Sequence, residues 1–366
     1  MNSWKDPFGS NPLGLWLADR RDRKNRHISR IAARRGWLKP MGDRGKVLWV
    51  IAGASADSVR LAVELVRAIR EKRLDIRLVL TFEQEYADML ALLDNCDKTG
   101  WGYAPCDHPR ALARVMQRFE PYGVIVVGTQ PRRNLSKLLD QHQRVLAINP
   151  PQPVAFHTER IYNGTSLLGT DQPTEIGDMR AILAQAQIDP NFKSLVNHGA
   201  ERHLWWLHGA TADSSAAIAR QLFAHAADDV LFVSGERPAA DCLKISSWDR
   251  TPIAGGSIVW VDDEKWLPAI SAAVTATHLA DIVPVTLWQA MAGGAAISCP
   301  DHALLPKPAL HAAITACVNP LPVWQSWRAN VIQARQQGDI ARRLFWQERR
   351  LAESMSQELV QRVFEW

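Results

Sequence analysis

A short motif occurs twice in this chain, and the repeat constrains the fold more than any other feature. The first copy is Trp49–Ser58 and the second is Trp206–Ser214. In both copies an apolar run leads into Gly-Ala-(Ser/Thr)-Ala-Asp-Ser, and an amphipathic stretch with helical spacing follows. A strand, a turn of small residues and a helix open a Rossmann-like unit. Two openings therefore predict two similar α/β domains in tandem.

Strands and helices are expected to alternate around both copies of the motif, which predicts parallel sheets. The expected fold class is α/β of the GT-B type, with two Rossmann-like domains whose parallel sheets face a cleft. The expected domains are a basic arm (1–46), an N-terminal domain (47–150), a Pro- and Gly-rich linker (151–200), a C-terminal domain (201–322) and terminal helices (323–366). Strands are expected at 47–51, 76–81, 123–128, 144–149, 204–207, 230–234 and 257–261, and helices at 83–93, 110–119 and 178–187.

The charge of the chain is concentrated in the arm. Residues 1–46 hold twelve Lys or Arg and four Asp or Glu, whereas the whole chain has a net charge of only +5. Apolar residues such as Leu13 and Trp16 are interleaved with these basic residues, a composition typical of a segment that lies on an anionic membrane surface. A solvated basic tail is the equally weighted alternative. Nucleic acid is a poorer partner, because the basic residues stay within the arm and no nucleic-acid motif is present.

The chain has no apolar stretch long enough to span a membrane, since the longest, Leu287–Cys299, contains Gln289 and is too short. Without a signal peptide, residues 47–366 are expected in the cytoplasm. The five cysteines are scattered and form no C-x-x-C pair, which argues against a zinc site and against a disulfide framework.

Several segments resemble motifs of the 3-deoxy-D-manno-octulosonic acid (Kdo) transferases. Trp49–Asp57 aligns with W-I-H-A-x-S-V-G-E, and Ala104–Pro109 aligns with L-P-x-D-x-P. Gly128–Leu135 aligns with E-T-E-L-W-P-N-L and keeps Thr129, Asn134 and Leu135, but it lacks both glutamates. In the second domain the aligned segments are Trp206–Ala212, Gly235–Pro238, Asp262–Leu267 and Val285–Gln289.

This resemblance implies a transferase that moves Kdo or a related sugar from a CMP-activated donor to a lipid A-type acceptor in lipopolysaccharide biosynthesis. It implies peripheral attachment at the cytoplasmic face of the inner membrane, and no cofactor or metal is expected. Asp57 takes the place of the family's catalytic glutamate and would be the general base. The expected acceptor-binding residues are Ser55, Thr129, Arg132, Arg133 and Asn134. The expected donor-binding residues are Thr211, Ala212, Arg237, Thr286, Leu287 and Gln289.

Three alternatives remain open from the sequence. Asp57 is also placed to cap the following helix, as Asp213 is in the second copy. The chain is either an active transferase or a non-catalytic relative that binds a sugar nucleotide, a lipid or a protein partner. A GT-B enzyme that uses another nucleotide sugar is the third possibility, because the sequence does not separate CMP from UDP.

Overall fold

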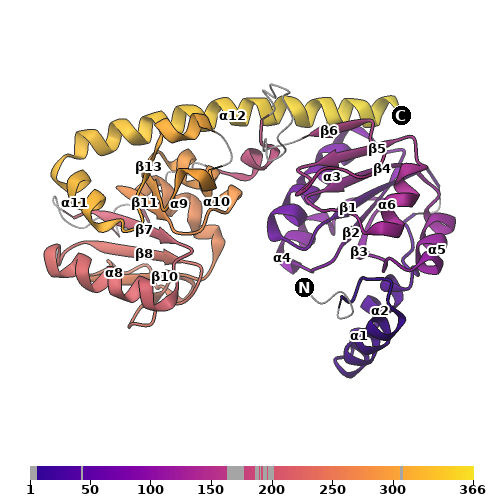
Figure 1. Ribbon diagram of the computed structural model, residues 1–366, viewed down its shortest axis with the longest axis horizontal. Helices are drawn as coiled ribbons and strands as arrows, with labels where there is room; N and C mark the ends of the chain where they lie inside the picture. Colours follow the sequence, from indigo (N-terminus) through magenta and orange to yellow (C-terminus); the bar gives the residue numbers. More distant parts are fainter. Residues whose placement is uncertain are drawn as a thin grey trace. The chain divides into compact units, whose positions relative to one another are not determined.

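The chain forms two compact units, Met1–Met179 together with Leu351–Trp366, and Arg180–Arg350 (Figure 1). The computed structural model describes residues 6–366 except 43, 163–176, 186–188, 190, 193–195, 197–201 and 306–307. Much of the expected linker, and part of the helix expected at 178–187, lie outside the described residues. Residues Met179–Leu183 of that helix form a short 3₁₀ turn, η3.

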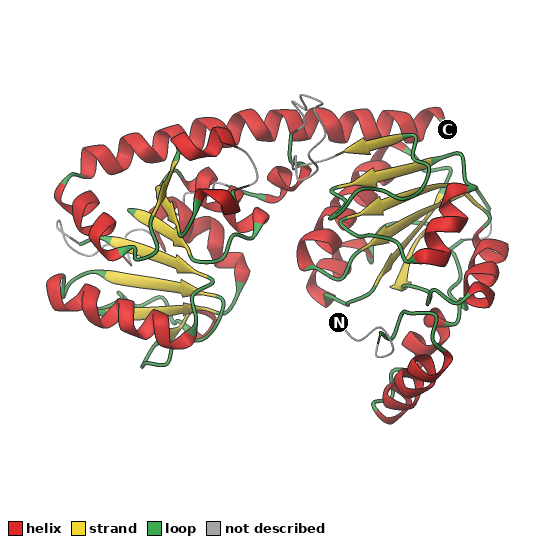
Figure 2. Ribbon diagram, in the orientation of Figure 1, coloured by secondary structure: helices red, strands yellow, loops and turns green. Residues whose placement is uncertain are grey.

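The first unit contains a parallel sheet with β1 near its centre. Its strands run in the order β3-β2-β1-β4-β5-β6, with β1 and β4 side by side at the point where the order reverses. The strands are β1 (Val47–Ala52), β2 (Arg77–Phe82), β3 (Thr99–Tyr103), β4 (Pro121–Val127), β5 (Val145–Ile148) and β6 (Arg160–Tyr162). The helices between them are α3 (Ala56–Lys72), α4 (Ala87–Leu90), α5 (Pro109–Phe119) and α6 (Arg133–Asp140). β1 is buried along its whole length because helices cover both faces of the sheet (Figure 2).

The second unit repeats this plan around β7. The strand order is β13-β12-β11-β7-β8-β10-β9, and again every pairing is parallel. Its strands are β7 (Leu204–His208), β8 (Val230–Ser234), β9 (Leu243–Lys244), β10 (Ser257–Val261), β11 (Ala276–Leu279), β12 (Ala296–Cys299) and β13 (Ile314–Ala316). Its helices include α8 (Ala212–His225), α9 (Leu267–Ala273), α10 (Pro284–Gly293) and α11 (Leu321–Ala329). The prediction of two parallel α/β domains of the GT-B type is confirmed in its two sheets.

The repeated tryptophan plays the same structural part in each sheet. The Trp49 indole of β1 donates a hydrogen bond to the Thr81 hydroxyl of β2 at 2.9 Å. The Trp206 indole of β7 donates to the Ser234 hydroxyl of β8 at 2.8 Å. Both tryptophans are fully buried, and a buried indole N–H needs such a partner. The repeat therefore extends from the turn into the core.

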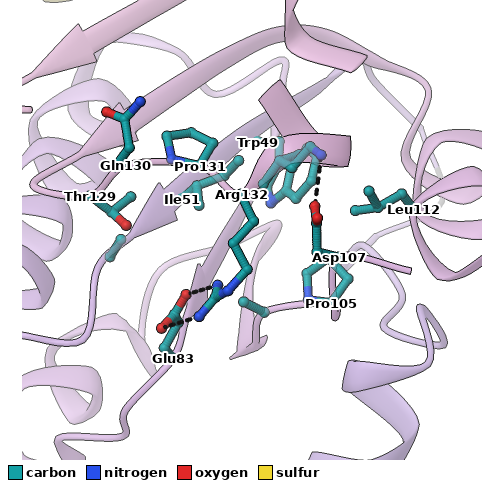
Figure 3. Close-up of a pocket in the computed structure, with 13 residues that line it drawn as sticks. Trp49, Ile51, Glu83, Pro105, Asp107, Leu112, Thr129, Gln130, Pro131 and Arg132 are labelled. Carbon is teal, nitrogen blue, oxygen red and sulfur yellow. Dashed lines mark hydrogen bonds and ion pairs between the residues drawn. The ribbon is translucent and has the colours of Figure 1, made fainter. Parts of the chain in front are cut away.

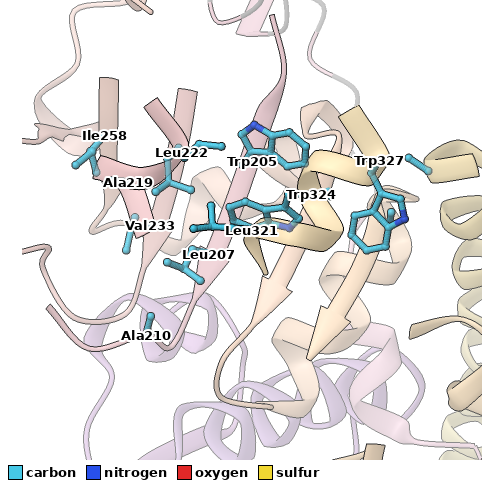
Figure 4. Close-up of a cluster of buried hydrophobic side chains, with 14 residues drawn as sticks. Trp205, Leu207, Ala210, Ala219, Leu222, Val233, Ile258, Leu321, Trp324 and Trp327 are labelled. Atoms are coloured by element: carbon cyan, nitrogen blue, oxygen red, sulfur yellow. The ribbon is translucent and has the colours of Figure 1, made fainter. Parts of the chain in front are cut away.

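The core of the second unit is built on stacked tryptophans. Trp205 of β7 stacks on Trp324 of α11, with ring centroids 5.0 Å apart, and the pair lies among buried aliphatic side chains such as Leu207 and Leu222 (Figure 4). Arg328 of α11 and the Trp205 indole both donate to the buried Asp229 carboxylate at 2.8 Å. These contacts hold α11 against the sheet.

The final helix, α12 (Val331–Glu365), supplies residues to both units. Its last part packs on the first unit, where Trp366 lies edge-on to Tyr122 and its indole donates to Glu159. Arg73 at the end of α3 donates to the carbonyl oxygens of Val363 and Phe364. The C-terminal segment is thus a part of the first unit.

The basic arm is folded onto the first sheet and is not a solvated tail. It forms α1 (Pro12–Lys24) and α2 (Ile28–Arg34). The buried Arg34 side chain is paired with the buried carboxylates of Asp19 and Asp22. Phe8 is 3% exposed, and its carbonyl oxygen accepts a hydrogen bond from the Asp107 amide. The tail alternative is therefore wrong, because the arm has its own buried polar contacts.

Strand β3 was absent from the sequence prediction because glycines at 100 and 102 disfavour strands. The arm explains these glycines. A Cβ on Gly100 would lie 2.8 Å from Met41 Cγ, and one on Gly102 would lie 2.8 Å from Leu38 Cδ1. Residues of the arm therefore pack directly on the backbone of β3, where no side chain fits.

Two further expectations differ from the structure. The helix expected over 83–93 is only α4 and a short 3₁₀ turn at Ala91–Leu93, and Glu83 instead pairs with Arg132. Strand β6 falls inside the stretch expected to be a linker, because Arg160–Tyr162 pairs with β5. Among the described residues, no helix has the length and apolar character needed to cross a bilayer.

We expect Arg34→Met to destabilise the first unit by about 3–5 kcal/mol, because it removes the buried cation that joins Asp19 and Asp22 and leaves Asp22 without a hydrogen-bonded cation. Arg35→Met is the matched control. Arg35 also pairs with Asp19, but its side chain is 51% exposed, so its loss should cost about 1 kcal/mol or less. Urea unfolding together with amide hydrogen exchange of residues 12–34 measures both effects. Equal losses from the two variants would contradict the account of the arm.

Candidate active site

The carboxyl edge of the first sheet is shaped by a close approach of two chain segments. The Gly53 amide, just after β1, donates to the Val127 carbonyl at 3.1 Å and to Ser58 Oγ at 2.7 Å. A Cβ on Gly53 would lie only 2.6 Å from the Gly128 carbonyl oxygen. A larger residue does not fit at position 53, so the motif needs its glycine there. Because β1 and β4 meet where the strand order reverses, this edge is the usual place for a ligand in an open α/β sheet.

Asp57 follows this turn, and it is not the cap of the helix. Ser55 is the N-cap of α3, and its hydroxyl accepts the Ser58 amide at 3.3 Å. Thr211 caps α8 in the same way, accepting the Ser214 amide at 3.3 Å. Asp57 lies in the first turn of α3 and is half-buried. The capping alternative for Asp57 is therefore wrong, because Ser55 is the residue that caps α3.

A small pocket lies at the same edge (Figure 3). Trp49, Glu83, Asp107, Thr129, Gln130 and Arg132 are among the residues that line it. Its internal volume is about 20 Å³, which is room for a single water molecule. Thr129 and Arg132, two expected acceptor-binding residues, are thus brought together.

Arg132 lines this pocket and is held by two carboxylates. Its guanidinium makes paired contacts with Glu83, and it also contacts Asp6 of the arm, with Arg132 Nε 2.7 Å from Asp6 Oδ2. Burial lowers the pKa of Arg132, but Glu83 and Asp6 outweigh it and raise this pKa above its ordinary value. An anionic ligand would therefore have to compete with Asp6 for this cation.

Asp107 organises the segment that carries the expected acceptor-binding residues. Its carboxylate accepts the Asn134 and Leu135 amides at 3.0 and 2.8 Å and so caps α6. The Asn134 side-chain amide donates back to the Asp107 carbonyl oxygen at 2.7 Å. These are residues that align with the Kdo transferase motifs, so this part of the resemblance has a structural cause. Arg133, at the start of α6, is exposed.

At the corresponding turn of the second unit, a glutamate side chain accepts a hydrogen bond from the start of the helix. The Ala212 amide at the start of α8 donates to Glu236 Oε2 at 3.2 Å. Gly209 adopts φ +74°, and a Cβ there would lie 2.6 Å from Asp281 Cβ. Thr211 and Ala212 are thus at the turn as expected, but the anion that meets them is a side chain of the same unit.

Arg237 lies beside this turn, exposed, with its guanidinium carbon 5.6 Å from the Trp260 ring centroid. His208 is hydrogen-bonded through Nδ1 to Ser234 Oγ at 2.8 Å. Burial lowers the pKa of His208 and Asp281 opposes this shift only in part. Burial therefore favours the neutral form of His208, whose imidazole is hydrogen-bonded to the Ser234 hydroxyl.

The remaining expected donor-binding residues lie in α10 and are largely buried. Thr286 is 7% exposed and Leu287 is fully buried. Gln289 donates to the Gln185 carbonyl at 2.6 Å and to Ser271 Oγ at 2.8 Å, and its own oxygen accepts the Gln185 amide. Its carboxamide therefore joins α10 to α9 and to the segment after η3.

Sequence reasoning missed Glu83, Asp6 and Glu236. Glu83 directly follows β2, and residues at the carboxyl ends of parallel strands gather at one edge, so its position could have identified it. Asp6 comes from the arm, and no local sequence pattern predicts its contact with Arg132. Among the described residues, no group of three or more His, Cys, Asp or Glu is placed to hold a metal ion.

Residues 29–149 match the family model described as 3-deoxy-D-manno-octulosonic-acid transferase (kdotransferase). This part of the chain is therefore similar to the N-terminal part of the Kdo transferases. The match includes the β1–α3 turn, Asp107 and the Thr129–Leu135 segment. No significant match is found among curated proteins.

Solved structures share the fold of the chain at low sequence identity. UDP-GlcNAc 2-epimerase from Neisseria meningitidis, bound to UDP-GlcNAc, is 11% identical with a TM-score of 0.55, covering 86% of this chain and 100% of that one. The glycosyltransferase SnogD from Streptomyces nogalater is 12% identical with a TM-score of 0.50, covering 87% and 99%. Anabaena HepE, in complex with UDP and glucose, is 8% identical with a TM-score of 0.51, covering 88% and 100%. The chain therefore has the GT-B fold.

We expect Asp107→Ala to destabilise the first unit by about 1–2 kcal/mol, the usual cost of losing a helix cap. Asp107→Asn should cost less, because its amide keeps one acceptor oxygen. Hydrogen exchange at the Asn134 and Leu135 amides should speed up in Asp107→Ala, since both lose their acceptor. Unchanged exchange at these two amides would contradict the capping role.

Proposed function

We propose that this chain is a glycosyltransferase that moves Kdo or a related sugar from a CMP-activated donor to a lipid A-type acceptor at a membrane surface. The match of residues 29–149 to the Kdo transferase family carries the proposal. The GT-B fold supports it, because the two units provide two ligand-binding edges of parallel sheets. The relatives in complex with UDP-GlcNAc, or with UDP and glucose, show that this fold accepts nucleotide sugars.

Asp57 is the proposed general base. Transfer with inversion requires a group that removes the proton from the acceptor hydroxyl as the new bond forms. Asp57 is a carboxylate at the ligand-binding edge of the sheet, in the first turn of α3, where Ser55 already caps the helix. Asp57 also occupies the position that aligns with the catalytic glutamate of the Kdo transferases, which supports this role.

Acceptor binding would engage Ser55, Thr129, Arg132 and Arg133. Arg132 is a guanidinium that can hold a phosphate through two parallel hydrogen bonds. The acceptor's phosphate would replace Asp6 at Arg132, while Glu83 keeps the guanidinium oriented. Asn134 contributes through the backbone of α6, since its side chain is bonded to Asp107.

Donor binding would use the turn at Thr211 and Ala212, together with Arg237 and the start of α10 at Thr286. The amides at the start of α8 suit a phosphate, but Glu236 has to leave the Ala212 amide first. Arg237 lies next to Glu236 in sequence and supplies the positive charge. Leu287 and Gln289 would shape this region through packing, as their buried positions require.

A non-catalytic relative is the second candidate, and specific contacts favour it. Arg132 is neutralised by Asp6 and Glu83, and the α8 amide is occupied by Glu236. A protein that keeps the fold but closes both anion sites with its own carboxylates would bind a partner without turning over a sugar.

The experiment is an assay of the full chain with a CMP-Kdo donor and a lipid A-type acceptor. Asp57→Asn should lower turnover on the order of 10²–10⁴-fold, the usual contribution of a positioned base. Donor binding should be nearly unchanged, and stability should fall by less than about 1 kcal/mol, the usual size of a carboxylate's interaction with the helix dipole.

Asp213→Asn is the matched control, since Asp213 lies at the equivalent position of α8 and the proposal gives it no proton to move. Its turnover should stay close to that of the unchanged chain. Equal losses from both variants would reject Asp57 as the base. No turnover by the unchanged chain would favour the non-catalytic relative.

A further inference from the structure

A second and larger pocket lies in the arm. Its volume is about 530 Å³, which is enough for a small organic ligand. Gly14, Leu17, Ala18 and Arg21 line it from α1. These positions share one face of the helix, since they follow the spacing of three and four residues. His27, Arg30 and Arg34 line it from the α2 side.

The pocket has more positive than negative charge. Three arginines and one histidine line it, whereas Asp22 is the carboxylate among its lining residues. Asp22 is buried and directed at Arg34, to which it is hydrogen-bonded. Asp19, the other carboxylate of this helix pair, contacts Arg34 and Arg35. Asp19 and Asp22 are thus hydrogen-bonded to Arg34 and Arg35, and Arg30 lies 3.9 Å from Asp22 without a hydrogen bond to it, so Arg21 and Arg30 keep donors for a ligand.

Arg30 has unused hydrogen-bonding capacity. Its nearest carboxylate oxygen is Asp22 Oδ1, 3.9 Å from Nη1, which is too far for a hydrogen bond. Its Nε is buried with no partner among the described residues, and so is Nε of Arg34, whose side chain is 1% exposed. The Arg30 guanidinium is held in place from the side, since its central carbon lies 4.9 Å from the Tyr103 ring centroid. It is therefore positioned but incompletely satisfied.

Exposed apolar side chains lie on the same helix as this pocket. Leu13 is 59% exposed, Trp16 is 55% exposed, and Leu17, which also lines the pocket, is 42% exposed. Arg20 lies over the Trp16 ring at 5.6 Å. Large apolar side chains together on a surface mark a contact site, and tryptophan and leucine beside basic residues are typical of helices that lie in a lipid interface.

We propose that the α1–α2 pocket binds the phosphate of an anionic phospholipid head group while Leu13, Trp16 and Leu17 enter the lipid interface. A guanidinium matches phosphate through two parallel hydrogen bonds, which Arg21 and Arg30 can supply. The apolar side chains explain why the phosphate belongs to a lipid, because a free anion would leave them exposed. The inference rests on the membrane location in the proposed function and is independent of its catalytic step.

The test keeps the charge constant, so that it distinguishes a specific phosphate site from general electrostatic attraction to the vesicle surface. Arg21→Lys with Arg30→Lys preserves two positive charges but removes both guanidinium forks. Arg23→Lys with Arg26→Lys is the matched control, since both arginines are exposed residues of the arm outside the pocket. Sedimentation of the full chain is measured with phosphatidylcholine vesicles that contain or lack phosphatidylglycerol.

The unchanged chain should sediment with the phosphatidylglycerol vesicles. The pocket variant should bind them at least about tenfold more weakly, which corresponds to about 1.4 kcal/mol, and the control should bind as the unchanged chain does. Equal binding by all three proteins would overturn the pocket and leave a non-specific basic surface. No sedimentation of the unchanged chain would overturn both the pocket and the membrane location, without touching the transferase assay.

A second measurement identifies the source of the phosphate. Glycerol 1-phosphate and inorganic phosphate are titrated against the full chain by calorimetry, each with and without vesicles. Weak binding of glycerol 1-phosphate that the pocket variant loses supports the head-group assignment. Inorganic phosphate that binds tightly and prevents sedimentation would instead make the pocket a site for a free anion and overturn the lipid assignment.

Discussion

The turn between β1 and α3 lies against the end of β4, and the candidate site depends on this close approach. The Gly53 amide bonds to the Val127 carbonyl and to Ser58, and Ser58 Oγ in turn donates to the same carbonyl at 2.5 Å. Gly128 adopts φ +58°, and a Cβ there would lie 2.8 Å from Ser58 Oγ. This contact places the first turn of α3 and the Thr129–Arg132 segment at one edge. Asp57 and the pocket of Arg132 owe their positions to it.

The arm adds a second constraint on the same edge. Phe8 is buried, and the guanidinium carbons of Arg30, Arg34 and Arg132 each lie less than 6 Å from the centroid of its ring, at 5.9, 5.9 and 5.8 Å. One aromatic side chain thus contacts both the basic pocket of the arm and the cation of the candidate acceptor site. A shift of the arm, such as one caused by binding to a surface, would therefore alter the contacts that Arg132 makes with Phe8 and Asp6. Phe8 and Asp6 are thus the residues through which the proposed lipid site and the proposed acceptor site would be coupled.

The sequence predicted the parts of the fold that depend on local pattern. Strands β1, β2, β4, β5, β7, β8 and β10 are continuous apolar runs, and the repeated motif identified the two central strands. Strand β3 could not be predicted, because Gly100 and Gly102 serve contacts with distant Met41 and Leu38. Composition indicated either a solvated tail or a membrane segment for the arm, because it does not show that Arg34 pairs with Asp19 and Asp22. At the site, Asp57 and the Thr129–Asn134 segment were found by motif, whereas Asp6 and Glu236 contact it only through tertiary structure.

The proposed function requires this GT-B chain to bind a cytidine nucleotide. Calorimetric titration of the full chain with CMP, UDP and GDP tests it most directly, because the nucleotide is the part of the donor that all turnovers share. We expect CMP to bind at least about tenfold more tightly than UDP or GDP, which corresponds to about 1.4 kcal/mol. We also expect Arg237→Ala to weaken CMP binding. Tighter binding of UDP, or no binding of any of the three nucleotides, would contradict the proposed function.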